Sequence, residues 1–157
     1  MKYFLIVFTL MAATITWGKS GPEKHLNFII EIDNDIPVGT INQVAINLHN
    51  DKNSKPIKAG YYPGDLIISE SDYKRIIDSS DESIDLSLTY YRVSDTTSIN
   101  YKVEISKSLL ANRYIIIRIY NTEQGPYQGI YKPLDKGRTY TFELYSPDQT
   151  FTRVKLK

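Results

Sequence analysis

Four stretches of the chain alternate apolar and polar residues with a period of two, and this pattern constrains the fold more than any other feature. They are residues 25–33, 42–50, 83–93 and 98–106. Because successive side chains of a β-strand point to opposite faces, each stretch predicts a strand with one buried face. Turn-forming residues separate these stretches from several shorter apolar runs, so we expect about eight short strands in an all-β sandwich or barrel.

Residues 113–121 form a strand of another kind. Ile115, Ile116 and Ile117 are consecutive, so both faces of the strand are apolar. This pattern is typical of a central strand that is covered on both sides.

Short polar segments rich in turn formers separate the predicted strands. Pro63 and Gly64 stand in the order that a type II turn requires, since proline fixes the first central residue and glycine supplies the positive φ of the second. Residues 94–98, 122–126 and 146–149 each predict a turn that joins two strands as a hairpin.

One segment, residues 69–78, has helical rather than alternating spacing. Ser69 precedes Asp72 by three residues, which is a helix-start signal, and Tyr73, Ile76 and Ile77 follow with helical spacing. We therefore predict one short helix of two turns near 69–78, lying across one end of a sheet.

The N-terminal residues have the pattern of a secretory signal peptide. Lys2 precedes a run of 14 uncharged residues, 3–16, and small and polar residues follow. We place the cleavage after Gly18, within one to three residues, which leaves a single domain, 19–157, that is secreted or periplasmic. An uncleaved signal anchor is the alternative. The chain has no cysteine, so the stability of the domain must come from its core.

Charge and residue content exclude several classes of function. Residues 19–157 carry 18 basic and 18 acidic residues, interspersed, so no nucleic-acid partner is expected. His25 and His49 are the only histidines, which disfavours both a zinc site and a Ser-His-Asp hydrolase. The acidic segments 33–35 and 78–85 are interpreted as turn and linker residues, with weak calcium binding left open. We predict no cofactor and no catalysis.

Residues 133–144, with the sequence PLDKGRTYTFEL, are interpreted as a structural corner between two strands. Pro133 ends a strand, Gly137 permits a turn that a Cβ would resist, and Tyr140 opens an alternating strand. A buried tyrosine needs a partner for its hydroxyl group, and we expect the backbone of the corner just upstream to supply it.

The spacing of Leu134, Gly137 and Tyr140 resembles the Leu-x-x-Gly-x-x-Tyr signature at the E–F corner of fibronectin type III and related immunoglobulin-like domains. The resemblance covers residues 134–144 and implies an antiparallel sandwich in which 127–131, 139–145 and 150–156 would be strands E, F and G. The early tryptophan that is usual in such domains is missing, since Trp17 lies in the signal peptide.

We expect the domain to be a non-catalytic binding module that recognises a protein or a glycan through loops at one end. If successive hairpin turns alternate between the two ends, the turns 122–126 and 146–149 share the end opposite the corner. The predicted contact residues are therefore Glu123, Gln124, Tyr127, Asp148 and Gln149. Tyrosine is abundant, with 13 residues, and its broad face with a polar tip suits such contacts.

Two alternative functions stay open at this point. Strand 26–32 lies near the mature N-terminus and could complete the sheet of a neighbouring subunit, as donor strands do in pilus subunits. The size and compartment also suit an inhibitor or immunity protein of the cell envelope.

Overall fold

A computed structural model describes residues 21–50, 55–147, 150–152 and 155–156 of the chain. The predicted signal peptide, 1–18, lies outside the described residues. Within the described residues, no helix has the length and apolar character needed to cross a membrane.

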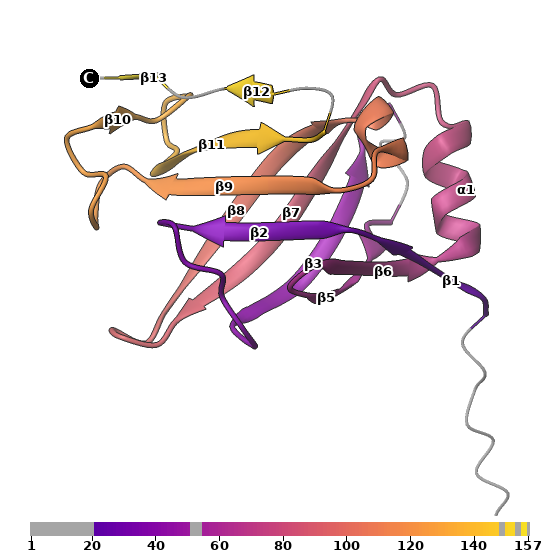
Figure 1. The fold of residues 1–157 in the computed structure, drawn as a ribbon, viewed down its shortest axis with the longest axis horizontal. Helices are drawn as coiled ribbons and strands as arrows, with labels where there is room; N and C mark the ends of the chain where they lie inside the picture. The colour runs from indigo at the N-terminus through magenta and orange to yellow at the C-terminus, as the bar shows by residue number, and fades with distance from the viewer. Residues whose placement is uncertain (1–20, 51–54, 148–149, 153–154, 157) are drawn as a thin grey trace, which may run out of the picture.

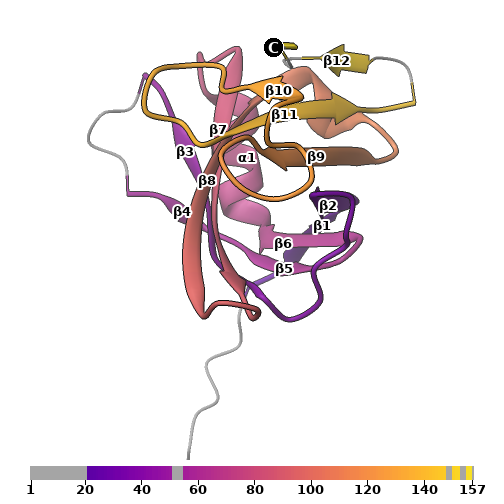
Figure 2. The ribbon, with the colours of Figure 1, turned by 90° about the vertical axis from the view of Figure 1, so that its left-hand side faces the viewer.

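Two four-stranded sheets form the body of the molecule, one layer against the other (Figures 1 and 2). In spatial order, the first contains β12 (Thr150–Thr152), β11 (Tyr140–Tyr145), β9 (Ile115–Asn121) and β2 (Phe28–Ile32). The second contains β4 (Ile57–Lys58), β3 (Ile41–Leu48), β7 (Ser83–Arg92) and β8 (Thr97–Ser106). The predicted all-β, sandwich-like fold with one short helix is therefore confirmed.

Two smaller sheets extend this body. One contains β1 (Glu23–Leu26), β6 (Asp65–Ser69) and β5 (Gly60–Tyr62), and it joins the first large sheet because β1 runs almost directly into β2. The other pairs β10 (Tyr131–Lys132) with β13 (Lys155–Leu156).

The core lies between the two large sheets and follows the alternation of the sequence. Phe28, Ile30 and Ile32 of β2 are buried, as is every second residue of β8 from Tyr101 to Ile105. The seven residues of β9 lie between β11 and β2, so its predicted central position is confirmed. Burial of large apolar side chains contributes the main stabilising free energy of such a fold.

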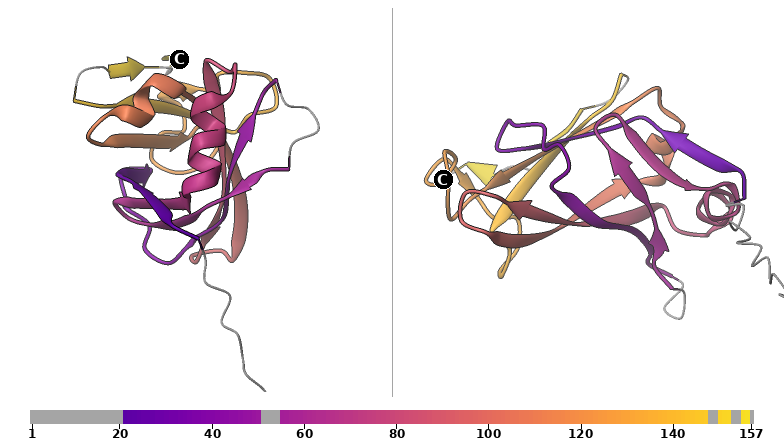
Figure 3. Two further views of the ribbon diagram at one scale, coloured as in Figure 1. Left: turned by 90° about the vertical axis from the view of Figure 1, so that its right-hand side faces the viewer. Right: turned by 90° about the horizontal axis from the view of Figure 1, so that it is seen from below.

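The one α-helix, α1 (Glu70–Asp78), begins where the sequence predicted. The Ser69 side chain caps the helix by accepting a hydrogen bond from the Asp72 backbone N–H at 3.0 Å. Ile76 is the helix residue that is buried. Figure 3 shows α1 at one end of the molecule. A 3-10 turn, η1 (Lys107–Ala111), follows β8.

Local turn signals were mostly reliable. Gly64 has a φ of +92°, as the predicted type II turn requires, and β7 and β8 pair along ten residues as the predicted hairpin. β11 and β12 also pair as a hairpin across residues 146–149.

The pairing of β9 differs from the prediction. Its C-terminal turn, 122–126, does not form a hairpin, because β9 pairs with β11 on one side and with β2 on the other. The β2 pairing is parallel, so the sandwich is not purely antiparallel. Within 127–131, which the resemblance implied to be strand E, only Tyr131 is in a strand. Strand 26–32, the possible donor strand, fills the sheet of its own chain as β2.

The 133–139 corner has the expected backbone but a different hydrogen bond. Gly137 has a φ of +91°, and Leu134 packs against the core. The Tyr140 hydroxyl group, however, donates to the Lys102 carbonyl at 2.9 Å and accepts from the Lys102 N–H at 2.6 Å. The predicted partner, the corner backbone just upstream, is wrong, because Tyr140 faces the other sheet. Since β8 is an edge strand, this hydroxyl group joins the two sheets at that edge.

Candidate functional site

Of the predicted contact residues that the structure describes, Glu123 and Gln124 line a common hollow and Tyr127 does not. Tyr140 lies opposite Asn121 and Tyr145 lies opposite Ile116, so β9 and β11 run in opposite directions. Residues 122–126 therefore lie at the same end as the 133–139 corner, and the Thr122 N–H donates to the Thr139 carbonyl at 2.8 Å. The prediction that the turns 122–126 and 146–149 share an end is wrong, because it assumed that β9 pairs with the segment directly after it. Asp148 and Gln149 lie outside the described residues.

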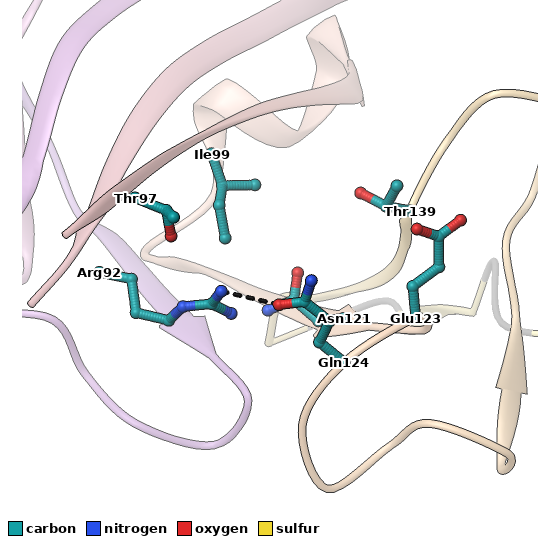
Figure 4. A pocket seen from close by; sticks show the side chains of 7 residues that line it. All are labelled: Arg92, Thr97, Ile99, Asn121, Glu123, Gln124 and Thr139. Carbon is teal, nitrogen blue, oxygen red and sulfur yellow. Dashed lines mark hydrogen bonds between the residues drawn. The ribbon is translucent and has the colours of Figure 1, made fainter. Parts of the chain in front are cut away.

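Glu123 and Gln124 border a small hollow at the end where these loops meet, and we call it the end hollow (Figure 4). Its volume is about 160 Å³. It opens between the two large sheets, with β7 and β8 on one side and the segments after β9 and before β11 on the other. Its lining residues are Arg92, Thr97, Ile99, Asn121, Glu123, Gln124 and Thr139.

Arg92 spans the mouth of the end hollow, and its guanidinium group bonds both Asp95 and Gln124. Its Nε donates to Asp95 at 2.9 Å and its Nη2 bonds the second Asp95 oxygen, so the pair is bidentate. Nη2 also donates to Gln124 Oε1 at 2.7 Å, across the hollow (Figure 4). The hydrogen bonds from Arg92 and Thr97 hold the pKa of Asp95 well below its ordinary value. The Arg92 charge is therefore already neutralised by Asp95.

A buried polar network lies behind the end hollow. Asn121 accepts a hydrogen bond from the Tyr101 hydroxyl group at 2.9 Å, and its backbone N–H and side-chain amide both donate to the Asp33 carboxylate, at 2.8 and 2.6 Å. Burial raises the pKa of Tyr101, and the nearby Asp33 charge raises it further. Asn121 of β9 thus bonds Tyr101 of the second sheet and Asp33 at the start of loop 33–40. These hydrogen bonds make the back wall of the end hollow rigid.

Two loops begin at residues of the end hollow or beside it. Arg92 and Thr97 of the lining stand on either side of the hairpin tip 93–96, and Asn121 of the lining bonds Asp33, where loop 33–40 begins. The Tyr91 N–H donates to the Thr40 carbonyl at 2.8 Å, which fixes the end of the loop to the hairpin. Three apolar side chains at this end are exposed: Ile36, Val38 at 64% and Val93 at 66%.

Tyr127, the remaining predicted contact residue, lies in a tyrosine cluster on the outer face of the first sheet. Its ring packs on Tyr120 at 4.7 Å and on Tyr131 at 5.5 Å between centroids, and its hydroxyl group bonds the Asn34 side chain. The cluster covers the buried carboxylate of Glu143, which accepts the Tyr120 hydroxyl group at 2.9 Å. Tyr127 therefore has a structural function that its sequence context did not reveal.

Both histidines and the acidic residues Asp33 and Asp85 have protein partners. The His25 ring nitrogen bonds the Asp65 carboxylate at 2.9 Å, while His49 and Lys102 both contact Asp85, at 2.8 and 2.7 Å. From the other acidic segment, the Asp33 carboxylate binds Asn121, as described above. Within the described part of the chain, no three metal-ligating side chains gather at one point.

A larger hollow, of about 800 Å³, lies beside α1, between Lys55–Ala59 and the helix residues Asp72 and Arg75. Its lining includes Lys55, the first described residue after position 50. The end hollow is enclosed by described residues only, and for this reason we take it as the candidate site.

Sequence reasoning found two of the seven residues that line the end hollow, Glu123 and Gln124. It missed Arg92, Ile99 and Asn121, which reach the site only because β9 pairs with β11 and leaves its C-terminal turn facing the β7–β8 hairpin. The one local signal in the sequence was Arg92 at the end of a predicted strand, with Asp95 three residues after it. Comparisons of the chain with models of known families, with curated proteins and with solved structures find no match.

Proposed function

We propose that this protein is a secreted or periplasmic, non-catalytic binding module that recognises a protein or glycan through the loops at one end of its β-sandwich. The observation that carries the proposal is the end hollow itself, where the β7–β8 hairpin end faces residues 121–124 and Arg92 bonds Gln124 across the space. Loop 33–40 begins beside it, since Asp33 bonds Asn121, and Figure 2 shows this end of the molecule. The signal-peptide pattern of residues 1–18 supports the compartment.

The physical support is the contrast between fixed walls and exposed neighbouring loops. The Asn121 hydrogen bonds hold the back wall and the Arg92–Asp95 pair holds the mouth, whereas Val38 and Val93 of the neighbouring loops extend into solvent. Binding surfaces on loops that a rigid scaffold positions lose less conformational entropy when the partner binds. Exposed aliphatic side chains beside polar groups then supply both contact area and hydrogen bonds.

The test uses a matched pair of surface variants. The mature protein would be immobilised and exposed to the secreted and envelope fractions of its source and to an array of glycans. Val93→Ser changes an exposed residue of the hairpin tip beside the end hollow, and Ile77→Ser changes an exposed residue of α1 at the other end. Both changes keep the core intact, so folding should be equal by circular dichroism.

We expect one bound species that wild type and Ile77→Ser retain and that Val93→Ser loses. Retention of the same species by all three proteins would place the binding surface elsewhere and contradict the proposal. If the retained species is an enzyme that the protein inhibits, the inhibitor alternative gains support within the same binding proposal.

A further inference from the structure

The size of the end hollow restricts what can enter it. A cavity of roughly 150 Å³ accommodates one benzene-sized group, whereas sites for drug-sized ligands occupy about 300–1,000 Å³. At about 160 Å³, the end hollow has room for a single side chain or a group of similar size. It would therefore take one anchoring residue of a larger partner rather than a whole small molecule.

The lining suits a side chain with an apolar stem and a polar tip. Ile99 packs against the core on one wall and Thr97 and Thr139 border the space (Figure 4). Glu123, Gln124 and Asn121 supply oxygen atoms on the other side. Long cationic side chains are of this amphipathic kind, because their methylene stems pack on apolar surface while the charged group stays among polar atoms.

The charge of the lining selects a cation. Arg92 is the one basic residue of the lining, and the bidentate contact with Asp95 neutralises it. For Glu123, no cation of the described chain lies within ion-pair distance. Behind Asn121, the Asp33 carboxylate is a second negative charge. It accepts hydrogen bonds from the backbone N–H and the side-chain amide of Asn121. Glu123 is therefore the charged residue of the lining that has no ionic partner among the described residues, and it is exposed to solvent.

The exposed side chains of the neighbouring loops favour a protein over a glycan. Ile36, Val38 and Val93, three exposed apolar residues of these loops, are aliphatic. Aliphatic side chains interdigitate with the apolar side chains of another protein, but they offer no flat ring on which a sugar could stack. A pocket for one anchoring side chain, surrounded by near-neutral contacts, is the arrangement found at many protein–protein interfaces.

From these four observations we infer that the end hollow binds a lysine or arginine side chain of a partner protein, with Glu123 as the residue that contacts the cation. This inference rests on the proposed function and specifies its partner class. It also assigns the specificity to one carboxylate, which a single isosteric change can test.

The probe is a phage-displayed library of random peptides selected against the immobilised wild-type protein. The enriched peptides are then measured against Glu123→Gln, which removes the charge but keeps the shape, and against Glu82→Gln. Glu82 is exposed and precedes β7 at the other end of the sandwich, so its variant is the matched control. Val93→Ser tests the neighbouring hairpin tip separately.

We expect enriched peptides to share one Lys or Arg, and Glu123→Gln to weaken their binding about two- to fivefold while Glu82→Gln leaves it unchanged. Their affinity for wild type should also fall with added salt, and that dependence should be smaller for Glu123→Gln. Peptides without a shared basic residue, the absence of enriched peptides, or equal binding by Glu123→Gln would overturn the inference. If in addition Val93→Ser has no effect on any bound peptide or glycan, the proposed function fails as well.

Discussion

Replacing Tyr140 with phenylalanine isolates the contact that joins the two sheets at the β8 edge. The ring of Tyr140 is 5% exposed and packs edge-on against Tyr101, with 4.9 Å between centroids. Phenylalanine keeps this ring contact and removes one oxygen atom. That oxygen atom makes two hydrogen bonds with the Lys102 backbone, at 2.6 and 2.9 Å.

The expected cost follows from what remains after the oxygen atom is lost. The Lys102 N–H loses its partner, in a partly buried position, and the Lys102 carbonyl keeps only a long contact of 3.5 Å with Arg138. Among the described residues, β8 has no neighbouring strand on that side to replace the lost hydrogen bonds. A net loss of about 0.5–1.5 kcal/mol for each hydrogen bond gives about 1–3 kcal/mol of unfolding free energy. For a domain of this size, that corresponds to a decrease in Tm of roughly 3–12 °C.

The assay is urea denaturation of residues 19–157 as wild type, as Tyr140→Phe and as the control Tyr62→Phe, followed by tyrosine fluorescence and far-ultraviolet circular dichroism. Tyr62 is 65% exposed, and its variant should stay within about 0.5 kcal/mol of wild type. The slope of unfolding free energy against urea should be the same for all three, since the core is unchanged. A Tyr140→Phe variant as stable as Tyr62→Phe would refute the inter-sheet function of the hydroxyl group.

Three further changes test other parts of the structure. Ser69→Ala removes the cap of α1 and should lower the unfolding free energy by about 1 kcal/mol, against no change for the exposed Ser94→Ala; equal urea midpoints would contradict the cap. Burial raises the pKa of Tyr101 and Tyr120, so folding stabilises their protonated forms, and stability that is complete below about pH 10 should be lost as the pH rises further. Tyr101→Phe should reduce that loss in urea titrations at alkaline pH, and an unchanged slope would contradict it. Deletion of residues 19–32 removes Phe28, Ile30 and Ile32, whose burial is worth about 5–9 kcal/mol. The shortened chain should therefore show no folded monomer by circular dichroism. Wild-type polymers that disappear on deletion would instead support the donor-strand alternative.

The sequence predicted those features that local physics determines. The two-residue period identified the long strands, because alternation alone decides which face is buried, and Ser69 and Asp72 identified the start of α1. Gly64 and Gly137 have the positive φ that their turn positions required. None of these features depends on residues far away in the chain.

The features that the sequence did not predict all depend on pairing between distant segments. The parallel contact of β2 with β9 has no local pattern, and neither does the choice of β11 rather than residues 127–131 as the neighbour of β9. The hydroxyl group of Tyr140 needed a partner, but only the packing of the two sheets brings Lys102 to it. For the same reason, Arg92 and Asn121 could not be assigned to one site with Glu123 before the sheet order was known.

The central claim is that a partner binds the loops around the end hollow, and hydrogen–deuterium exchange measured with and without the captured partner tests it most directly. Backbone amides that a partner covers exchange more slowly, so protection reports the position of the interface. We predict added protection in residues 33–40, 91–97 and 121–127. Protection confined to α1 or to the start of β7, with these loops unchanged, would contradict the account.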